Sequence, residues 1–296
     1  MPTRIARCLS LSLLLTLALP ALASAQDFAK GARPMGMGEA FNAISTGTAG
    51  VYNNPAGIAR AILFGVEGSY TYTPTGNLLS AAIVDSKTNP AITAGLGVGY
   101  YFDRQRDNGD DITALDFRLP LAMPIVPEKI SVGLGLRYLS ISNKDIETLS
   151  GLTLDAGALF QIVDGLHVGV AVKNIIDPCE TASRCAGIVP LTVGGGVSYG
   201  SIEQAFVISG DVNYDLSGVD GAGLNFALGG EYLVENMIPV RLGFKREALP
   251  NSNIVTVGAG WRSKTAGLDA SYQHIISSDG QDAGPGQITL GVSVSR

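Results

Sequence analysis

The chain has 296 residues, of which 46% are hydrophobic and 16% charged, and its net charge is −6. This negative balance argues against nucleic-acid binding, which requires a basic surface. It contains 38 glycines, and beyond the N-terminus no apolar run reaches the roughly 20 residues of a membrane helix, which favours a β-rich chain.

The first 25 residues have the features of a secretion signal. Arg4 and Arg7 make a positive start, and an apolar run from Leu9 to Leu22 follows. Ala23-Ser24-Ala25 then matches a signal-peptidase cleavage site. A retained membrane anchor is the alternative, but the apolar run is short for a membrane span. We therefore expect residues 1–25 to be a signal peptide and the protein to be exported.

The next segment, Gly31 to Arg60, is rich in Gly, Ala, Asn and Met and lacks the alternation of a strand. Asn54 and Pro55 form a helix-start signature, because Asn can cap free N–H groups and Pro fits the first helical turn. A flexible arm is one interpretation, and a compact plug is the other. We predict that residues 26–60 form a small plug with short helices, located in the periplasm or the barrel lumen.

From Ile62 onward, apolar residues alternate with polar residues or glycine, which is typical of strands with one apolar face. About fourteen such strands are predicted, and an even number fits single-chain outer-membrane barrels. Twelve is the alternative, because the second and ninth segments are weak. The predicted spans are 62–73, 77–86, 91–102, 112–121, 129–142, 151–162, 165–174, 188–200, 203–216, 222–234, 237–247, 253–262, 265–276 and 286–296.

The longer connections between these strands are all odd-numbered. They are predicted at 103–111, 142–150, 175–187, 216–221 and 277–286, whereas the odd connection at 73–76 is short. Outer-membrane barrels have short periplasmic turns and longer outer loops. We therefore predict a barrel domain over 61–296, with both of its ends on the periplasmic side.

Charged residues within the predicted strands lie on the face opposite the apolar one. A lysine or arginine that faces lipid at the membrane centre costs on the order of 2–4 kcal/mol, so these charges should face the lumen. Six are acidic and six basic, which favours a lumen closed by ion pairs and a plug over an open pore. They are Glu67, Asp116, Arg118, Arg137, Asp155, Lys173, Asp211, Glu231, Arg241, Lys245, Arg262 and Asp269.

A soluble barrel or sandwich would show the same alternation with the apolar face inward. The glycine-rich polar face, the unequal connections and the tyrosines near strand ends favour a membrane barrel. The predicted fold is all-β: a transmembrane antiparallel β-barrel in the outer membrane of a diderm bacterium.

Few residues offer covalent or metal chemistry. Cys179 and Cys185 lie close together in a predicted outer loop, and in an exported protein they are expected to form a disulfide. A metal site is the alternative, but it needs more ligands, and His167 and His274 lie in distant strands. Neither histidine accompanies a recognisable nucleophile motif, so we expect no enzyme activity, no metal and no cofactor.

The segment before the strands resembles the N-terminus of FadL-like outer-membrane barrels, the long-chain fatty acid transporter superfamily that includes PorV/PorQ-type proteins. Looser matches are Gly165 to Ile175 and Ile238 to Lys245. The matching plug-motif residues are Met35, Gly36, Gly38, Tyr52, Asn54, Pro55, Ala56 and Gly57.

The resemblance implies a fourteen-stranded barrel with an N-terminal hatch. In transporters of this type, hydrophobic substrates bind inside the barrel and leave laterally through a wall opening, whereas PorV-type members serve protein secretion. The first hypothesis is therefore passive transport of hydrophobic small molecules through a plugged lumen. The alternative is a scaffold that binds exported proteins.

The implied partners are outer-membrane lipid and either a hydrophobic ligand or a secreted protein. Transport predicts an apolar pocket in the lumen and a gap in the wall. Pro120 and Pro124 are expected to mark a disrupted strand end, because proline removes a hydrogen bond from the ladder.

Overall fold

The computed structural model describes residues 30–103, 112–143, 146–178, 189–201, 205–249, 251–278 and 284–296. The predicted signal peptide at 1–25 and the expected disulfide between Cys179 and Cys185 lie outside these residues.

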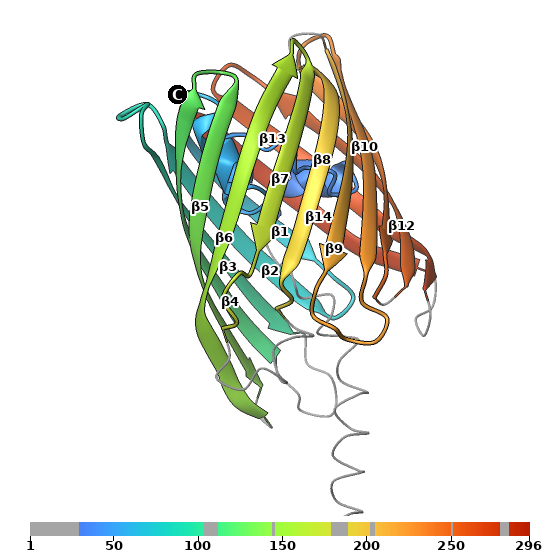
Figure 1. The fold of residues 1–296 in the computed structure, drawn as a ribbon. Helices are drawn as coiled ribbons and strands as arrows, with labels where there is room; N and C mark the ends of the chain where they lie inside the picture. Colours follow the sequence, from blue (N-terminus) through green and yellow to red (C-terminus); the bar gives the residue numbers. More distant parts are fainter. Residues whose placement is uncertain are drawn as a thin grey trace, which may run out of the picture.

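The strands form a closed antiparallel barrel in which each strand pairs with its neighbours in sequence and β1 closes on β14 (Figure 1). This confirms the predicted fold class and excludes the alternative of twelve strands. The strands are β1 (Phe64–Tyr72), β2 (Gly76–Asp85), β3 (Thr93–Asp103), β4 (Ile112–Val126), β5 (Ile130–Asn143), β6 (Ile146–Val163), β7 (Leu166–Lys173), β8 (Thr192–Ser201), β9 (Phe206–Asp215), β10 (Leu224–Val234), β11 (Ile238–Glu247), β12 (Ser252–Arg262), β13 (Ala266–Ser278) and β14 (Gly284–Ser295).

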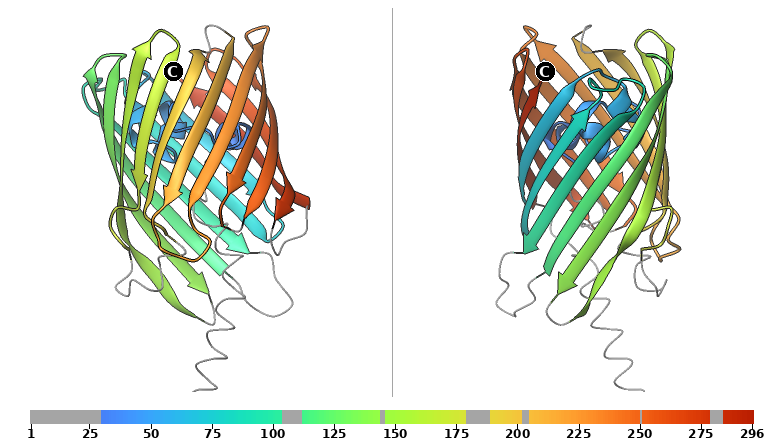
Figure 2. Two further views of the ribbon diagram at one scale, coloured as in Figure 1. Left: turned by 45° about the vertical axis from the view of Figure 1, so that its right-hand side comes forward. Right: turned by 90° about the vertical axis from the view of Figure 1, so that its left-hand side faces the viewer.

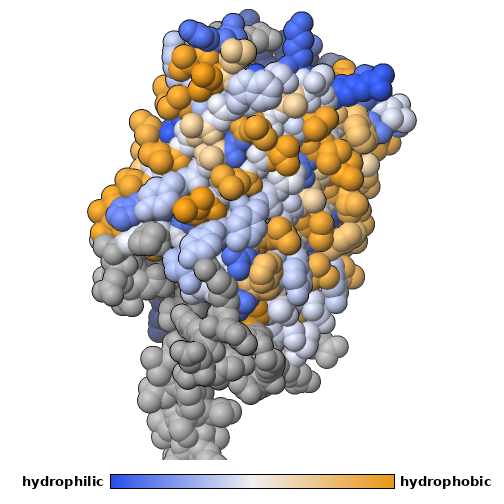
Figure 3. Space-filling model, turned by 180° about the vertical axis from the view of Figure 1, so that it is seen from behind, coloured by the Kyte–Doolittle hydropathy of each residue, from blue (hydrophilic) through white to orange (hydrophobic). Residues whose placement is uncertain are grey.

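The two faces of the wall differ as the alternation predicts. Leu134 and Leu242 are 62% and 65% exposed on the outside, whereas Arg137 and Arg241, on the opposite face of the same strands, are 1% exposed. Figure 3 shows hydrophobic side chains distributed over the outer wall. An apolar exterior around a polar interior is the arrangement of a membrane barrel, because lipid solvates the outer face.

Three short helices lie inside the barrel, in the half nearer the C-terminus (Figure 2). They are α2 (Ala32–Gly36), η1 (Gly47–Val51) and η2 (Pro55–Ala59). None of the described helices is long and apolar enough to cross a membrane. We call residues 30–63 the plug, and most of its side chains are buried. The plug, with its short helices, is therefore part of the fold.

Glycines on the lumen face of the wall accommodate the plug. A Cβ atom added at Gly169 would lie 2.1 Å from the carbonyl oxygen of Asn42, and one at Gly229 would lie 2.2 Å from that of Met37. Similar contacts below 3.3 Å occur at Gly97, Gly133, Gly157, Gly243 and Gly258. The glycines of the polar face therefore let the plug approach the wall closely, and we call these glycines the glycine seats of the plug.

Two local predictions are wrong. The expected outer loop at 142–150 is largely strand, because β5 and β6 continue pairing to Asn143 and Ile146. Ile141 and Leu149 pair across this hairpin and pack on the lumen side, so inward burial extends the strands. Likewise, β4 does not end at Pro120 but continues to Val126, with an irregularity in register after Pro124.

Candidate functional site: the plugged lumen

Asn54 and the two residues after it join the plug to the wall at β5, β6 and β7. The Asn54 side chain accepts a hydrogen bond from Ala56 N at 3.1 Å, which caps η2. Its amide donates to the carbonyls of Asn42 and Val170 at 3.0 and 3.2 Å. Pro55 occupies the first helical position and packs on Gly133. One asparagine thus links the cap, the plug and the wall.

Within the plug, the close approach of two segments requires Gly57, because a Cβ there would lie 2.6 Å from the carbonyl oxygen of Ser45. Ala56, the preceding residue, is completely buried. The last part of the motif therefore packs on the plug itself as well as on the wall.

The first part of the plug motif contacts β12 and β13. Thr256 of β12 accepts a hydrogen bond from Gly38 N and donates to Gly36 O, both at 3.0 Å. Gly38 has a φ of 63°, which favours glycine. Met35 is buried and its sulfur accepts from Gln273 at 3.6 Å. The turn after α2 is therefore fixed by one threonine.

An ion-pair network connects Tyr52, at the C-terminal end of η1, to β4 and β5. Arg118 forms three hydrogen bonds to the Asp116 carboxylate at 2.8–3.2 Å, and Arg137 forms two at 3.0 Å. Arg118 also donates to the Tyr52 carbonyl at 3.0 Å, and its guanidinium lies 5.5 Å from the Tyr52 ring centroid. Asp155 lies 3.8 Å from Arg118. These side chains are almost fully buried, so paired charges fill this section of the lumen.

The Tyr52 side chain also contacts the wall directly. Its hydroxyl lies 2.5 Å from the Ala81 carbonyl and 3.1 Å from that of Val98. Burial raises the pKa of this phenol, so it remains a neutral hydrogen-bond donor.

A second network lies on the opposite side of the plug. Glu231 accepts two hydrogen bonds from Arg33 at 3.0 Å, one from Arg241 at 2.5 Å and one from Arg262 at 3.2 Å. Arg241 also forms an ion pair with Asp269 at 2.6 Å, without hydrogen-bond alignment. The plug therefore contributes one cation, Arg33, to a carboxylate of the wall.

Glu39 of the plug supplies the reverse contact, from a plug carboxylate to a wall cation. It pairs with Lys245 at 2.8 Å and with Lys30. Burial would raise the pKa of Glu39, but the two lysines together lower it to about 2. Lys245 also pairs with Glu247 at 2.5 Å. Ion pairs in both directions thus hold the plug against β10 and β11.

The three remaining predicted lumen charges also contact the plug. Glu67 accepts from Thr48 at 2.6 Å, and Lys173 donates to the Tyr52 carbonyl at 3.4 Å. Asp211 accepts from the backbone N–H groups of Phe41 and Asn42, both at 2.7 Å. All twelve charges thus lie on the lumen face, and they form networks around the plug.

An apolar cluster lies on the lumen face toward the outer rim, beyond the Asp116 network. Ala114, Leu139, Ile141 and Val189 are buried together there. Tyr101, Ile112 and Leu149 pack against them, and Pro178 lines the same shallow cleft. We call this set the outer apolar cluster.

Sequence reasoning missed the outer apolar cluster. Leu139 and Ile141 continue the alternation of Arg137, and that parity places them in the lumen. Both lie near the end of the predicted strand 129–142, beyond the charged residues that defined the lumen face, so their apolar character did not predict a lumen lining.

The wall has an interruption where β3 faces Pro120. The β3–β4 ladder includes the pairs Ala94↔Leu121 and Gly97↔Arg118 but lapses between them. Proline cannot donate to the ladder. On the inner side, Val51 of the plug lies close to Gly95. We call this place the β3–β4 seam.

Few of the described side chains bear on the prediction that the protein has neither a metal site nor a catalytic site. The described residues contain no group of three or more His, Cys, Asp or Glu side chains arranged to hold a metal. His167 is buried on the lumen face, and His274 contacts Tyr272 at 3.2 Å.

Several solved structures share this fold. The Pseudomonas putida toluene transporter TodX aligns with 91% of this chain and 99% of its own, at a TM-score of 0.62 and 13% identity. A second structure of this transporter aligns with 90% of this chain and 96% of its own, at a TM-score of 0.58 and 12% identity. The deltaS2 mutant of the TodX monoaromatic hydrocarbon channel aligns with 91% of this chain and 98% of its own, at a TM-score of 0.57 and 11% identity.

No protein-family model and no curated protein matches the chain. The structural likeness confirms the predicted fold, a barrel like that of the TodX hydrocarbon channel.

Proposed function

We propose that this barrel passively transports hydrophobic small molecules across the outer membrane. The observation that carries the proposal is the outer apolar cluster. A pore for ions or sugars needs polar groups along its path, whereas leucine, isoleucine and valine facing the lumen favour an apolar solute. We infer that the cluster is the first binding site for a molecule arriving from outside.

The remaining lumen supports a plugged transporter over an open channel. Behind the cluster lie the Asp116 network and the plug, whose ion pairs obstruct the lumen. The β3–β4 seam lies at the level of the plug, where Val51 and Gly95 meet. It offers a lateral way out that keeps an apolar solute away from water. In this proposal, binding and diffusion account for the activity, and no bond is made or broken.

The solute class is proposed from the same cluster. TodX, whose structure is similar, is a toluene transporter and a monoaromatic hydrocarbon channel. The cluster includes one aromatic ring, Tyr101, among aliphatic side chains. We therefore propose neutral hydrocarbons, with toluene as the first probe.

Gentle detergent extraction followed by native mass spectrometry tests this proposal. We expect full-length protein to retain apolar small molecules and to exchange them for added toluene. A stoichiometric protein partner, with no exchangeable small molecule, would instead support the PorV-like secretion scaffold. Among the described residues, no observation favours that scaffold.

A further inference from the structure

The hydrogen bond missing from the β3–β4 seam can be assigned to one acceptor, the carbonyl oxygen of Gly95. In antiparallel strands, the backbone N–H and C=O groups of successive residues point to opposite neighbours. The bond from Ser86 N to Leu63 O sets this alternation for β1 and β2, and the continuous register carries it to β3, where Gly95 points toward β4. The β3–β4 register places Pro120 opposite Gly95, and proline has no N–H to donate.

A second hydrogen bond gives the same result from the other side of β4. Gln161 N donates to Lys129 O at 2.7 Å, which sets the alternation for β5 and β6. Through the β4–β5 register, Leu119 and Leu121 then point toward β5, and Pro120 between them points toward β3. The lapse therefore leaves one backbone acceptor of β3 without a donor from β4.

Thr93 adds a second unpaired polar group, on the inner side of the seam. It precedes Gly95 by one position on the lumen face of β3, so the two residues lie roughly 7 Å apart along the strand. Its side chain is completely buried, and in the described part of the chain its hydroxyl has no hydrogen-bond partner. Buried polar groups are normally hydrogen-bonded, so both groups can accept a partner from a ligand.

The surroundings of these two polar groups are apolar. On the inner side, Val51 of the plug belongs to a buried apolar cluster with Val84 and Ala122 of the wall. On the outer side, Leu96 and Leu119 are exposed on the wall. A hydrogen bond is stronger in apolar surroundings than in water, and an unpaired polar group there is costly. A solute with one hydroxyl on an apolar body matches this arrangement.

We propose that the seam selects hydrocarbons that carry one hydroxyl group, such as p-cresol, over hydrocarbons that lack it. The hydroxyl of the solute donates first to Thr93 Oγ1 and then to the Gly95 carbonyl as the solute enters the wall. A site that hydrogen-bonds a hydroxyl discriminates against the analogue without it, because the polar group of the site then stays unpaired. This selectivity rests on the proposed function, because it names the solute class that the lateral exit favours.

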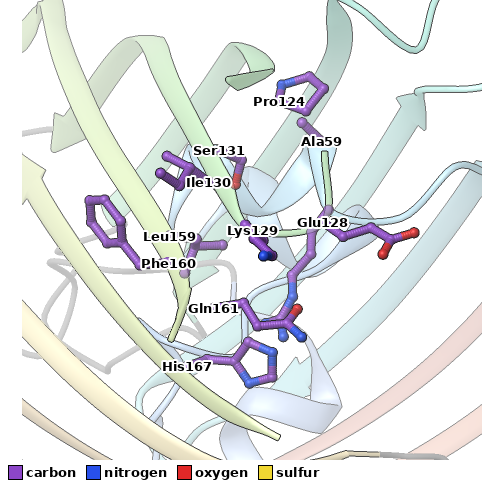
Figure 4. Close-up of a pocket in the computed structure, with 11 residues that line it drawn as sticks. Ala59, Pro124, Glu128, Lys129, Ile130, Ser131, Leu159, Phe160, Gln161 and His167 are labelled. Carbon is purple, nitrogen blue, oxygen red and sulfur yellow. The ribbon is translucent and has the colours of Figure 1, made fainter. Parts of the chain in front are cut away.

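Pro124, the second proline of β4, provides a matched control. β3 begins at Thr93, whose partner is Ala122, so Pro124 lies beyond the β3–β4 ladder. It lines a recess at the end of the barrel that carries the C-terminus, together with Ala59 and His167 (Figure 4). The volume of this recess is about 20 Å³, which holds about one water molecule and is too small for toluene.

Flux of three probes of similar size through a bilayer that contains the full-length protein tests the selectivity. p-Cresol is toluene with one hydroxyl added, and 4-methylanisole carries the same oxygen without a proton to donate. Each protein-dependent flux is measured at low solute concentration and corrected for partition into the bilayer. We expect the flux of p-cresol to exceed those of toluene and 4-methylanisole about three- to ten-fold, the effect of one hydrogen bond. Equal fluxes of p-cresol and 4-methylanisole would overturn the proposal.

Two substitutions assign the preference to the seam. Pro120→Ala supplies the missing N–H, and Thr93→Val removes the hydroxyl while keeping the branched shape. Each should lower the ratio of p-cresol flux to toluene flux about three-fold. The controls are Pro124→Ala and Ser271→Ala, which removes an unpaired buried hydroxyl on β13, and neither should change the ratio. An unchanged ratio in folded Pro120→Ala would overturn the proposal.

The same measurement separates this selectivity from the proposed transport. Toluene flux without a preference for p-cresol would leave the transport intact and overturn the selectivity alone. Absence of protein-dependent flux for all three probes would contradict the transport, and the selectivity with it. Heat-modifiable migration on gels checks that each variant is folded. If Pro120→Ala does not fold, an unchanged ratio in Thr93→Val would overturn the proposal.

Discussion

Two buried carboxylates in this lumen are each paired with several arginines. Asp116 receives two bidentate arginines, and Glu231 receives three arginines from three different segments. Removing one partner of a buried pair costs on the order of 3–5 kcal/mol because the other charge remains buried. The networks therefore specify where the plug lies.

Glu39 gives this arrangement a pH dependence. Its pKa is about 2 in the folded protein, below the ordinary value of 4.5. A lowered pKa contributes stability that is present above pH 4.5 and is lost as the pH falls toward 2. We expect hydrogen exchange of plug amides to accelerate over this range, with a loss of roughly 3 kcal/mol of protection. In Glu39→Gln this part of the dependence should disappear, and an unchanged acid profile would contradict the assignment.

Leu139 tests the outer apolar cluster at the level of one side chain. An unpaired amide in an apolar site costs on the order of 1–3 kcal/mol, so Leu139→Gln should weaken toluene binding about ten-fold. Leu139→Met keeps an apolar side chain of similar volume and should bind like the wild type. Calorimetric titration of the two variants makes the comparison, and equal affinities would show that toluene binds elsewhere.

At the scale of elements, the glycine seats explain how a wall of strands holds a plug. Gly229 and Gly230 are adjacent in β10 but face opposite sides. A Cβ at Gly229 would lie 2.2 Å from Met37 O, whereas one at Gly230 would find its nearest atom at 3.8 Å. Gly229→Val should therefore displace α2, and Gly230→Val should not. Protease sensitivity of the plug measures this, and equal sensitivity in both variants would argue against the seat.

The β3–β4 seam gives a second prediction at this scale. The register places Leu96 opposite Leu119 at the lapse, and Leu121 opposite Leu134 in the continuous part of the β4–β5 ladder. A disulfide between Leu96→Cys and Leu119→Cys should clamp the seam and abolish toluene transfer, and reduction should restore it. The Leu121→Cys and Leu134→Cys pair should have no effect. Transfer that continues through a clamped seam would exclude the lateral exit.

The strands were predictable because lipid imposes alternation on every strand that crosses it. Most predicted bounds agree with β1 to β14 within a few residues, and the lumen side of each charge follows from the same rule. The continuation of β5 and β6 was not predictable, because beyond the membrane the alternation no longer separates apolar from polar faces. The burial of Ile141 depends on Val189, a contact between distant segments that local pattern cannot reveal.

The plug motif shows a similar division. The cap at Asn54 and the helix that begins at Pro55 could be read from two residues. The partners of that motif could not, because hydrogen bonds from Asn54 to Val170 and from Gly38 to Thr256 join residues more than a hundred positions apart. Sequence pattern fixes local geometry, whereas the seat depends on the closed barrel.

For the whole molecule, the proposed function is that of a barrel that separates apolar solutes from ions. One apolar cluster lines the lumen toward the outer rim, ion pairs and the plug lie in its middle, and the β3–β4 ladder lapses at the seam. In this proposal, the plug and its ion pairs obstruct water and ions, whereas a small hydrocarbon has an apolar site and a seam. Selectivity therefore follows from the arrangement of the layers.

The most direct measurement follows toluene flux and ion conductance in the same asymmetric bilayer, with lipopolysaccharide in the outer leaflet and the full-length protein inserted. We predict that the protein accelerates toluene entry while the bilayer shows no large, steady single-channel conductance. A large steady conductance, or toluene entry no faster than through the protein-free bilayer, would contradict a plugged transporter of hydrophobic molecules.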